Sequence, residues 1–192
     1  MSLKILLVDQ HPGRSAILQQ ALSDAGYDIV AKINADGALS EEVKAFKPDV
    51  IIIDMEAPGR DTLEQMREIG RDHPKPIILF SNNRDKDYIR QAVKAGVSAY
   101  VVDGLDAARI SPIVEVALAR FREFEALRKE LDETRNQLAD RKIIDRAKGI
   151  LMKQHGVSED KAYSVLRKAA MDRNQKVSDI ARTLVTLSEM SP

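Results

Sequence analysis

The chain has 192 residues and no net charge, and its 44% hydrophobic and 31% charged residues suit one or two soluble domains with packed cores. It has no cysteine, which excludes disulfides, thiolate metal sites and cysteine nucleophiles. No signal-peptide pattern opens the chain, and no apolar run approaches the roughly 20 residues of a membrane span. We therefore expect a cytoplasmic protein without membrane contact.

Short apolar runs alternate with helical patterns through the first part of the chain. Charged residues, proline or glycine bound each run, as expected for strands that are buried on both faces of a sheet. The runs lie at 5–8, 29–33, 50–53, 77–80 and 99–102. Helical patterns follow them at 14–25, 40–46, 62–72, 87–95 and from 110 onward. Five such units in about 120 residues predict a doubly wound α/β fold around a parallel sheet.

Polar residues stand at the ends of three of these predicted strands. Asp9 ends the first strand, Asp54 the third and Ser81 the fourth. In a doubly wound sheet, sites form beyond the carboxyl ends of the strands, near the switch in strand order. We therefore expect these three side chains to face the same crevice.

The segments LLVDQ, IIIDMEAPG, ILFS and AYVVD resemble the receiver domain of bacterial response regulators, over about residues 3–120. The resemblance implies that Asp54 is the phosphoacceptor, that two acids after the first strand help it hold Mg²⁺, and that Ser81 binds the phosphoryl oxygen. It also implies a lysine after the fifth strand that completes the charge balance. Tyr100 stands where receivers keep a switch aromatic, and an ordinary half-buried strand tyrosine is the equal alternative.

Two positions depart from the receiver pattern. The second acid is replaced by Gln10, which offers one neutral oxygen where a hard dication prefers carboxylates. The lysine is replaced by Asp103, which puts a negative charge where phosphoryl transfer needs a positive one. We therefore predict a pseudo-receiver with a vestigial phosphoacceptor, no cofactor, and at most weak Mg²⁺ binding at Asp9 and Asp54. A receiver that still accepts phosphate at Asp54 is the alternative.

A helical pattern without glycine continues from residue 110 to about residue 138. Within 121–141, apolar residues and one threonine recur at alternating spacings of three and four, flanked by charged residues. This heptad pattern predicts a coiled-coil helix that joins two copies of the chain. The predicted dimer seam consists of Phe124, Leu127, Leu131 and Leu138. A single linker helix, held by ion pairs between residues four apart, is the alternative.

The last part of the chain, 142–190, is predicted to form a small three-helix bundle. Its first helix continues the long one, its second begins after Ser158, whose hydroxyl can cap free amides, and its third starts near Ser178. Val165 is one of the apolar residues assigned to the core. Between residues 141 and 176 the chain has ten basic and four acidic side chains, a charge of +6, so the remainder carries −6. This asymmetry favours a polyanionic partner for the basic end, with ordinary solvated helix faces as the alternative.

The segments AKGILM at 147–152, SEDKAY at 158–163, LRKAAM at 166–171 and VSDIA at 177–181 resemble the ANTAR domain, the RNA-binding module of AmiR- and NasR-type antiterminators. The resemblance implies a homodimer that binds a leader RNA with two hexanucleotide-loop hairpins and prevents a terminator from forming. We do not expect DNA as the partner, because no helix-turn-helix recognition helix follows a tight turn. The predicted RNA contacts are side chains that the bundle core does not need: Lys148, Gly149, Met152, Tyr163, Arg167, Lys168 and Arg173.

Further segments, AYVVDGL at 99–105, RDTLE at 60–64 and AMDRN at 170–174, make the chain similar to the NasT type of ANTAR regulator. That type serves nitrate and nitrite assimilation genes, and a nitrate-sensing inhibitor protein, NasS, holds it until nitrate appears. The resemblance therefore implies a regulator and not an enzyme. A phosphorylation-controlled DNA-binding regulator and a pure protein-interaction adaptor are the alternatives. The expected domains are a receiver-like domain at 1–120, a coiled-coil helix at 121–141 and an ANTAR domain at 142–190.

Overall fold

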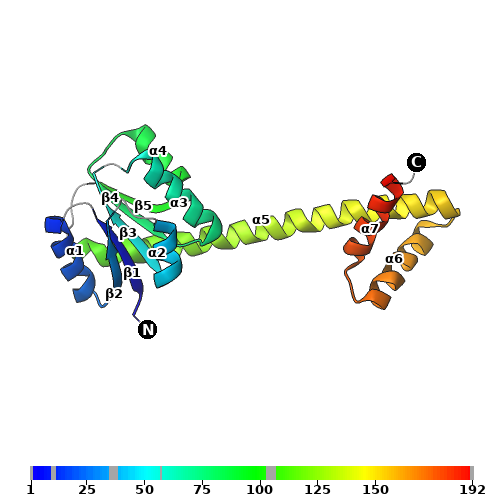
Figure 1. The fold of residues 1–192 in the computed structure, drawn as a ribbon, viewed down its shortest axis with the longest axis horizontal. Coiled ribbons are helices and arrows are strands. Elements are labelled where there is room, and N and C mark those ends of the chain that lie inside the picture. The colour runs from blue at the N-terminus through cyan, green and yellow to red at the C-terminus, as the bar shows by residue number, and fades with distance from the viewer. Residues whose placement is uncertain (1, 10–11, 35–38, 57, 103–106, 191–192) are drawn as a thin grey trace. The chain divides into compact units, whose positions relative to one another are not determined.

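The computed structural model describes residues 2–9, 12–34, 39–56, 58–102 and 107–190. The chain divides into two compact units, Met1–Glu125 and Ala126–Pro192. The first is an α/β unit and the second is helical (Figure 1).

A parallel five-stranded sheet with the order β2-β1-β3-β4-β5 forms the centre of the first unit. This arrangement confirms the predicted doubly wound fold. The strands are β1 (Lys4–Asp9), β2 (Asp28–Ile33), β3 (Val50–Asp54), β4 (Ile77–Ser81) and β5 (Val97–Val102). The helices of this unit are α1 (Pro12–Asp24), α2 (Leu39–Phe46), α3 (Arg60–Asp72), α4 (Lys86–Lys94) and the first part of α5 (Ala107–His155).

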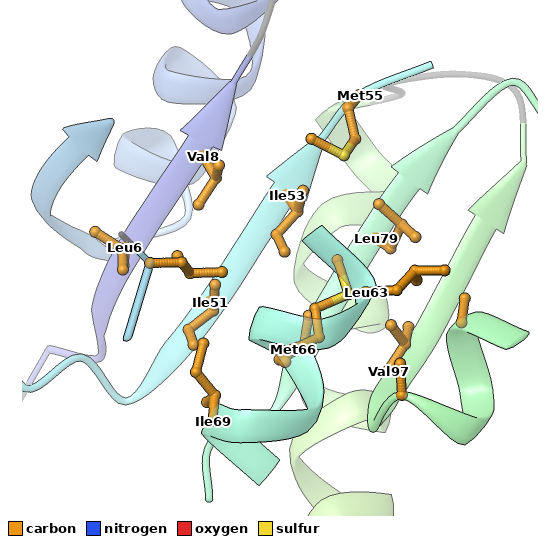
Figure 2. Packing of buried hydrophobic residues seen from close by; sticks show 14 of the residues in the cluster. Leu6, Val8, Ile51, Ile53, Met55, Leu63, Met66, Ile69, Leu79 and Val97 are labelled. Carbon is orange, nitrogen blue, oxygen red and sulfur yellow. The ribbon is translucent and has the colours of Figure 1, made fainter. Parts of the chain in front are cut away.

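Hydrophobic packing covers both faces of this sheet. Helices α2, α3 and α4 pack on one face, where Figure 2 shows Leu63, Met66 and Ile69 of α3 near Ile51 and Ile53 of β3. Helix α1 and the first part of α5 cover the other face. Residues that follow one another along a strand alternate between these two clusters, which explains why the central strands are apolar runs without polar alternation.

Helix α5 is continuous over 49 residues, from Ala107 to His155. It begins slightly before the predicted start at residue 110 and confirms that the long helix runs on into the C-terminal part. Its first turns pack against the sheet and its last turns against α6 and α7. Neither α5 nor any other described helix combines the length and the apolar content that a membrane crossing needs.

The second unit is a bundle of the last part of α5 with α6 (Glu159–Arg173) and α7 (Val177–Met190). Small and aliphatic side chains fill its core: Ala147, Leu151, Ala162, Leu166, Ala170, Ile180, Ala181 and Val185. The prediction that Val165 belongs to this core was wrong, since its side chain is 46% exposed. The core positions of α6 are four residues apart, and Val165 lies about 100° around the helix from Leu166.

The ends of these helices have local causes. Gly156 follows α5 with φ +65°, a left-handed conformation that glycine adopts without a steric cost. Ser158 caps α6 as predicted, because its side chain accepts a hydrogen bond from the backbone N–H of Lys161. Asn174, with φ 51°, ends the same helix. The short connections keep the three helices beside one another.

Candidate functional sites

The acid pocket lies at the carboxyl ends of the central strands. Asp9 on β1 and Asp54 on β3 are opposite one another in the parallel ladder. Ser81 ends the neighbouring β4, and all three residues are only 2% exposed. The structure therefore brings the three predicted strand-end residues to one edge of the sheet.

A lysine that the sequence analysis missed reaches this pocket from β2. Nζ of Lys32 lies 3.7 Å from Oδ2 of Asp9, and the two side chains are 35% and 1% exposed. Sequence reasoning looked for a cation only after the fifth strand. Lys32 reaches Asp9 because β2 lies next to β1 in the sheet. The lysine just before the end of the second predicted strand was the signal in the sequence that could have pointed to this contact.

Hydrogen bonds hold the loops after β3 and β4 against the neighbouring strands beside the pocket. The hydroxyl of Ser81 donates to the backbone carbonyl of Glu56, in the loop after β3. Tyr100 of β5 donates to the carbonyl of Asn83 at 2.8 Å. The Ser81 hydroxyl is thus engaged by the protein itself, and Tyr100 is tied to the loop after β4.

Tyr88 of α4 adds a second aromatic group on this side of the unit. Its hydroxyl donates to the carbonyl of Pro58 at 2.8 Å, and its ring meets that of Tyr100 edge to face at 6.4 Å between centroids. Burial raises the pKa of Tyr88 above its usual value, so the phenol stays protonated and remains a donor. Together the two tyrosines link the loops after β3 and β4 to α4 and β5.

The two departures from the receiver pattern, Gln10 and Asp103, lie outside the described residues, and their placement stays a prediction. Among the residues that the structure does describe, no group of three or more His, Cys, Asp or Glu side chains could hold a metal ion.

The predicted RNA-binding residues lie on the bundle of the second unit. Six of the seven are exposed, and α6 carries Tyr163, Arg167 and Met171 four residues apart on one stripe. Tyr163 is 44% and Met171 71% exposed. Within the described part of the chain, no ion pair engages Arg167, Lys168 or Arg173. This surface therefore combines free cations with an exposed aromatic ring and an exposed thioether.

Lys148 differs from the other six. Its Nζ lies 2.6 Å from Oδ1 of Asp145 and 2.7 Å from Oε1 of Glu159, and its side chain is only 16% exposed. The hydrogen bond to Asp145, followed by the one to Glu159, raises the pKa of Lys148, and the same bond lowers the pKa of Asp145. Lys148 thus ties the end of α5 to the first turn of α6.

Gly149 lies on the exposed side of α5. A Cβ atom built at this position meets no other atom within 4 Å, so no described helix of this chain needs the glycine. The space above Gly149 is open to a binding partner.

The predicted dimer seam forms an exposed stripe on the middle of α5. Phe124, Leu127, Leu131 and Leu138 are 64%, 59%, 50% and 55% exposed. Large apolar side chains repeated at heptad spacing on a solvent-facing helix are typical of a surface that another helix covers.

Two family models match the chain. The response regulator receiver domain matches residues 5–115, and the ANTAR domain matches residues 132–185. The transcriptional regulatory protein PdtaR of Mycobacterium tuberculosis is 32% identical over 168 residues, which are 88% of this chain and 82% of that protein. The chain belongs to the ANTAR-domain response regulators. This is a family of regulatory proteins, as the sequence analysis expected.

Other relatives are similar to only part of this chain. The nitrate regulatory protein of Klebsiella oxytoca is 40% identical over 68 residues, 35% of this chain and 17% of that protein. Among solved structures, a LuxR-family response regulator from Aurantimonas sp. SI85-9A1 has a TM-score of 0.54 and 28% identity, covering 62% of this chain and 86% of that one. The receiver domain of NarL from Mycobacterium tuberculosis, 24% identical with a TM-score of 0.53, covers 60% of this chain and 96% of that one, and shows the fold alone.

Proposed function

We propose that this response regulator is a transcription antiterminator. Its ANTAR domain binds a leader RNA with two hexanucleotide-loop hairpins and prevents a terminator hairpin from forming, so that the polymerase reads on. The observation that carries the proposal is the exposed surface of α6, where Tyr163, Arg167 and Lys168 lie within an ANTAR domain and the two cations form no ion pair with any residue that the structure describes.

The chemistry of this surface suits unpaired RNA loops. Arginine and lysine neutralise phosphates, and the release of condensed counterions makes such binding dependent on salt. A tyrosine ring or a guanidinium plane can stack on bases that are splayed out of a loop. Gly149 leaves room for close approach at the neighbouring end of α5.

A homodimer would present one bundle to each hairpin. If Phe124, Leu131 and Leu138 occupy the a positions of a heptad, Glu123 and Glu130 fall at g, and Arg128 and Arg135 fall at e. In a parallel dimer each g residue faces the e residue of the next heptad in the second copy, which pairs glutamate with arginine twice on each side. An antiparallel pair would set glutamate against glutamate and arginine against arginine. The charges therefore favour a parallel coiled coil.

Two tethered bundles bind paired hairpins more tightly than one bundle does, because the second binding event takes place within one complex.

We further propose that a nitrate-sensing inhibitor protein of the NasS type controls this regulator, which would then serve nitrate and nitrite assimilation genes. The support is Asp103, which replaces the lysine of the receiver pattern, together with the similarity to the nitrate regulatory protein of Klebsiella oxytoca. A receiver that does not switch with phosphate can still serve as a surface for a controlling protein.

A second candidate keeps phosphorylation at Asp54 as the switch. It is favoured by the placement of Asp54 at the end of β3, opposite Asp9 and next to the strand that carries Ser81. Incubation with acetyl phosphate and Mg²⁺ distinguishes the two candidates by intact-protein mass. We expect no stable phosphoaspartate, and high occupancy at Asp54 would favour the second candidate.

The antiterminator proposal is tested by measuring the affinity of the full chain for a two-hairpin leader RNA. Two competitors serve as controls, namely the same RNA with both loops mutated and duplex DNA of equal length. We expect strong preference for the intact hairpins. Equal affinity for all three nucleic acids would contradict loop recognition, and preference for duplex DNA would support a DNA-binding regulator.

A further inference from the structure

The cation beside the acid pocket comes from an unexpected strand. We propose that Lys32 is a built-in counter-ion of this pocket, and that it takes the place of the divalent cation that the receiver pattern implies. This role of Lys32 belongs to the pocket alone and does not depend on RNA binding.

The sheet register places the three charged groups on one face. Lys32 is opposite Leu7, Asp9 follows Leu7 two residues later on the same side of β1, and Asp54 is opposite Asp9 on β3. The strands run in the order β2-β1-β3, so the lysine and the two acids come from three neighbouring strands. The 3.7 Å between Nζ of Lys32 and Oδ2 of Asp9 is the outcome of that register.

The ammonium group of Lys32, more than the oxygen ligands of the pocket, argues against Mg²⁺. This ion prefers octahedral oxygen ligands and is held in proteins through carboxylates. The described part of the pocket offers two carboxylates, and the sequence has a neutral glutamine at position 10. An ammonium group already lies against Asp9, and a dication placed there would repel it.

The burial of Asp9 and Asp54 explains why a cation beside them is favourable. Two carboxylates at adjacent strand ends, both 2% exposed, repel each other and lose hydration. An ammonium within ion-pair distance offsets part of that cost. Because the lysine is covalently part of the chain, the compensation is present in every molecule and at every Mg²⁺ concentration.

The test measures the thermal unfolding midpoint of the full chain in EDTA and in excess Mg²⁺. We expect the midpoint of the wild-type protein to be the same in both. Lys32→Met should have a lower midpoint in EDTA, because Asp9 loses the ammonium that lies against it, and a midpoint several degrees higher once Mg²⁺ is added. Lys44→Met, which removes an exposed lysine of α2 in the same unit, is the matched control and should leave both midpoints unchanged.

Two outcomes would overturn the inference. One is a wild-type midpoint that rises with Mg²⁺ as much as that of Lys32→Met. The other is a Lys32→Met variant that is as stable as the wild type and insensitive to Mg²⁺. Should Lys32→Met not fold, Asp9→Asn and the double variant Asp9→Asn/Lys32→Met decide the question. If Lys32 acts through Asp9, the second substitution costs little once the acid is gone; a full additional loss contradicts the pairing.

Discussion

At the scale of single residues, neighbouring side chains determine whether each cation of the ANTAR domain forms ion pairs within the protein or is exposed to a binding partner. Lys148 is held between Asp145 and Glu159, whereas Arg167 and Lys168 lie on the open surface of α6. We therefore assign Lys148 a role in joining two helices, and we assign the other two cations to phosphate and base contacts.

This difference predicts different effects on stability for two alanine variants. Lys148→Ala should lower the unfolding midpoint, because two carboxylates lose the cation that they share. Arg167→Ala should leave the midpoint unchanged and weaken RNA binding roughly tenfold. Circular dichroism melts and RNA titrations of both variants measure the contrast. A Lys148→Ala midpoint equal to that of the wild type would contradict the helix-joining role.

Substitution of Gly149 by alanine should raise the stability of the protein and weaken its binding to RNA. Alanine at this position meets no atom of the described chain and has a higher helix propensity, so Gly149→Ala should stabilise the protein by about 0.5–1 kcal/mol. If RNA approaches this side of α5, the added methyl group should weaken binding at the same time. Unfolding in urea and RNA titration give the two values, and a stabilised variant with unchanged RNA affinity would exclude close approach at Gly149.

The sequence predicted the placement of some pocket residues and not of others. The convergence of Asp9, Asp54 and Ser81 was predictable, because every parallel strand of a doubly wound sheet ends at the same edge. The place of Lys32 was not, since it depends on β2 lying beside β1. The pairing of Lys148 with Glu159 was missed as well, because it depends on how α6 turns back along α5.

At the scale of elements, the sequence pattern predicted the exposed face of α5 correctly but misplaced one core residue of α6. The heptad pattern of α5 correctly predicted a long helix with an exposed apolar stripe. Glycine, serine and asparagine at the helix ends explain where α5 and α6 stop and start. Val165 was misassigned because it directly precedes Leu166, and the apolar residues of α6 are compatible with more than one inward face.

The seam predicts a dimer that a single substitution disrupts. Leu131→Asp replaces a leucine that the proposed dimer would bury in each copy, which should weaken self-association about 100-fold or more. Sedimentation equilibrium measures the effect. Leu187→Asp, at a similarly exposed leucine of α7, is the matched control and should leave the mass unchanged.

The orientation of the dimer has its own test. Glu123→Arg with Glu130→Arg should weaken the homodimer, as should Arg128→Glu with Arg135→Glu, while a mixture of the two variants should associate like the wild type. A monomeric wild-type protein at micromolar concentration would contradict the coiled coil, and a mixture no tighter than either variant alone would contradict its parallel register.

At the scale of the whole molecule, the zero net charge conceals two oppositely charged parts. The +6 between residues 141 and 176 belongs to the part that is proposed to bind RNA, and the acidic remainder includes the receiver. Phosphate contacts made by the basic part should give an affinity that falls steeply with salt. Each lost contact, as in Arg167→Ala, should reduce the slope of log affinity against log salt by about 0.7 to 0.9.

The most direct measurement of the central claim is transcription through a terminator in vitro. The template carries a leader with the two hexanucleotide-loop hairpins before the terminator, and the fraction of read-through transcript is measured with and without the full chain. We predict that the wild-type protein raises read-through, that Arg167→Ala raises it much less, and that a template with mutated loops does not respond. Read-through that the wild-type protein leaves unchanged on the intact leader would contradict the account.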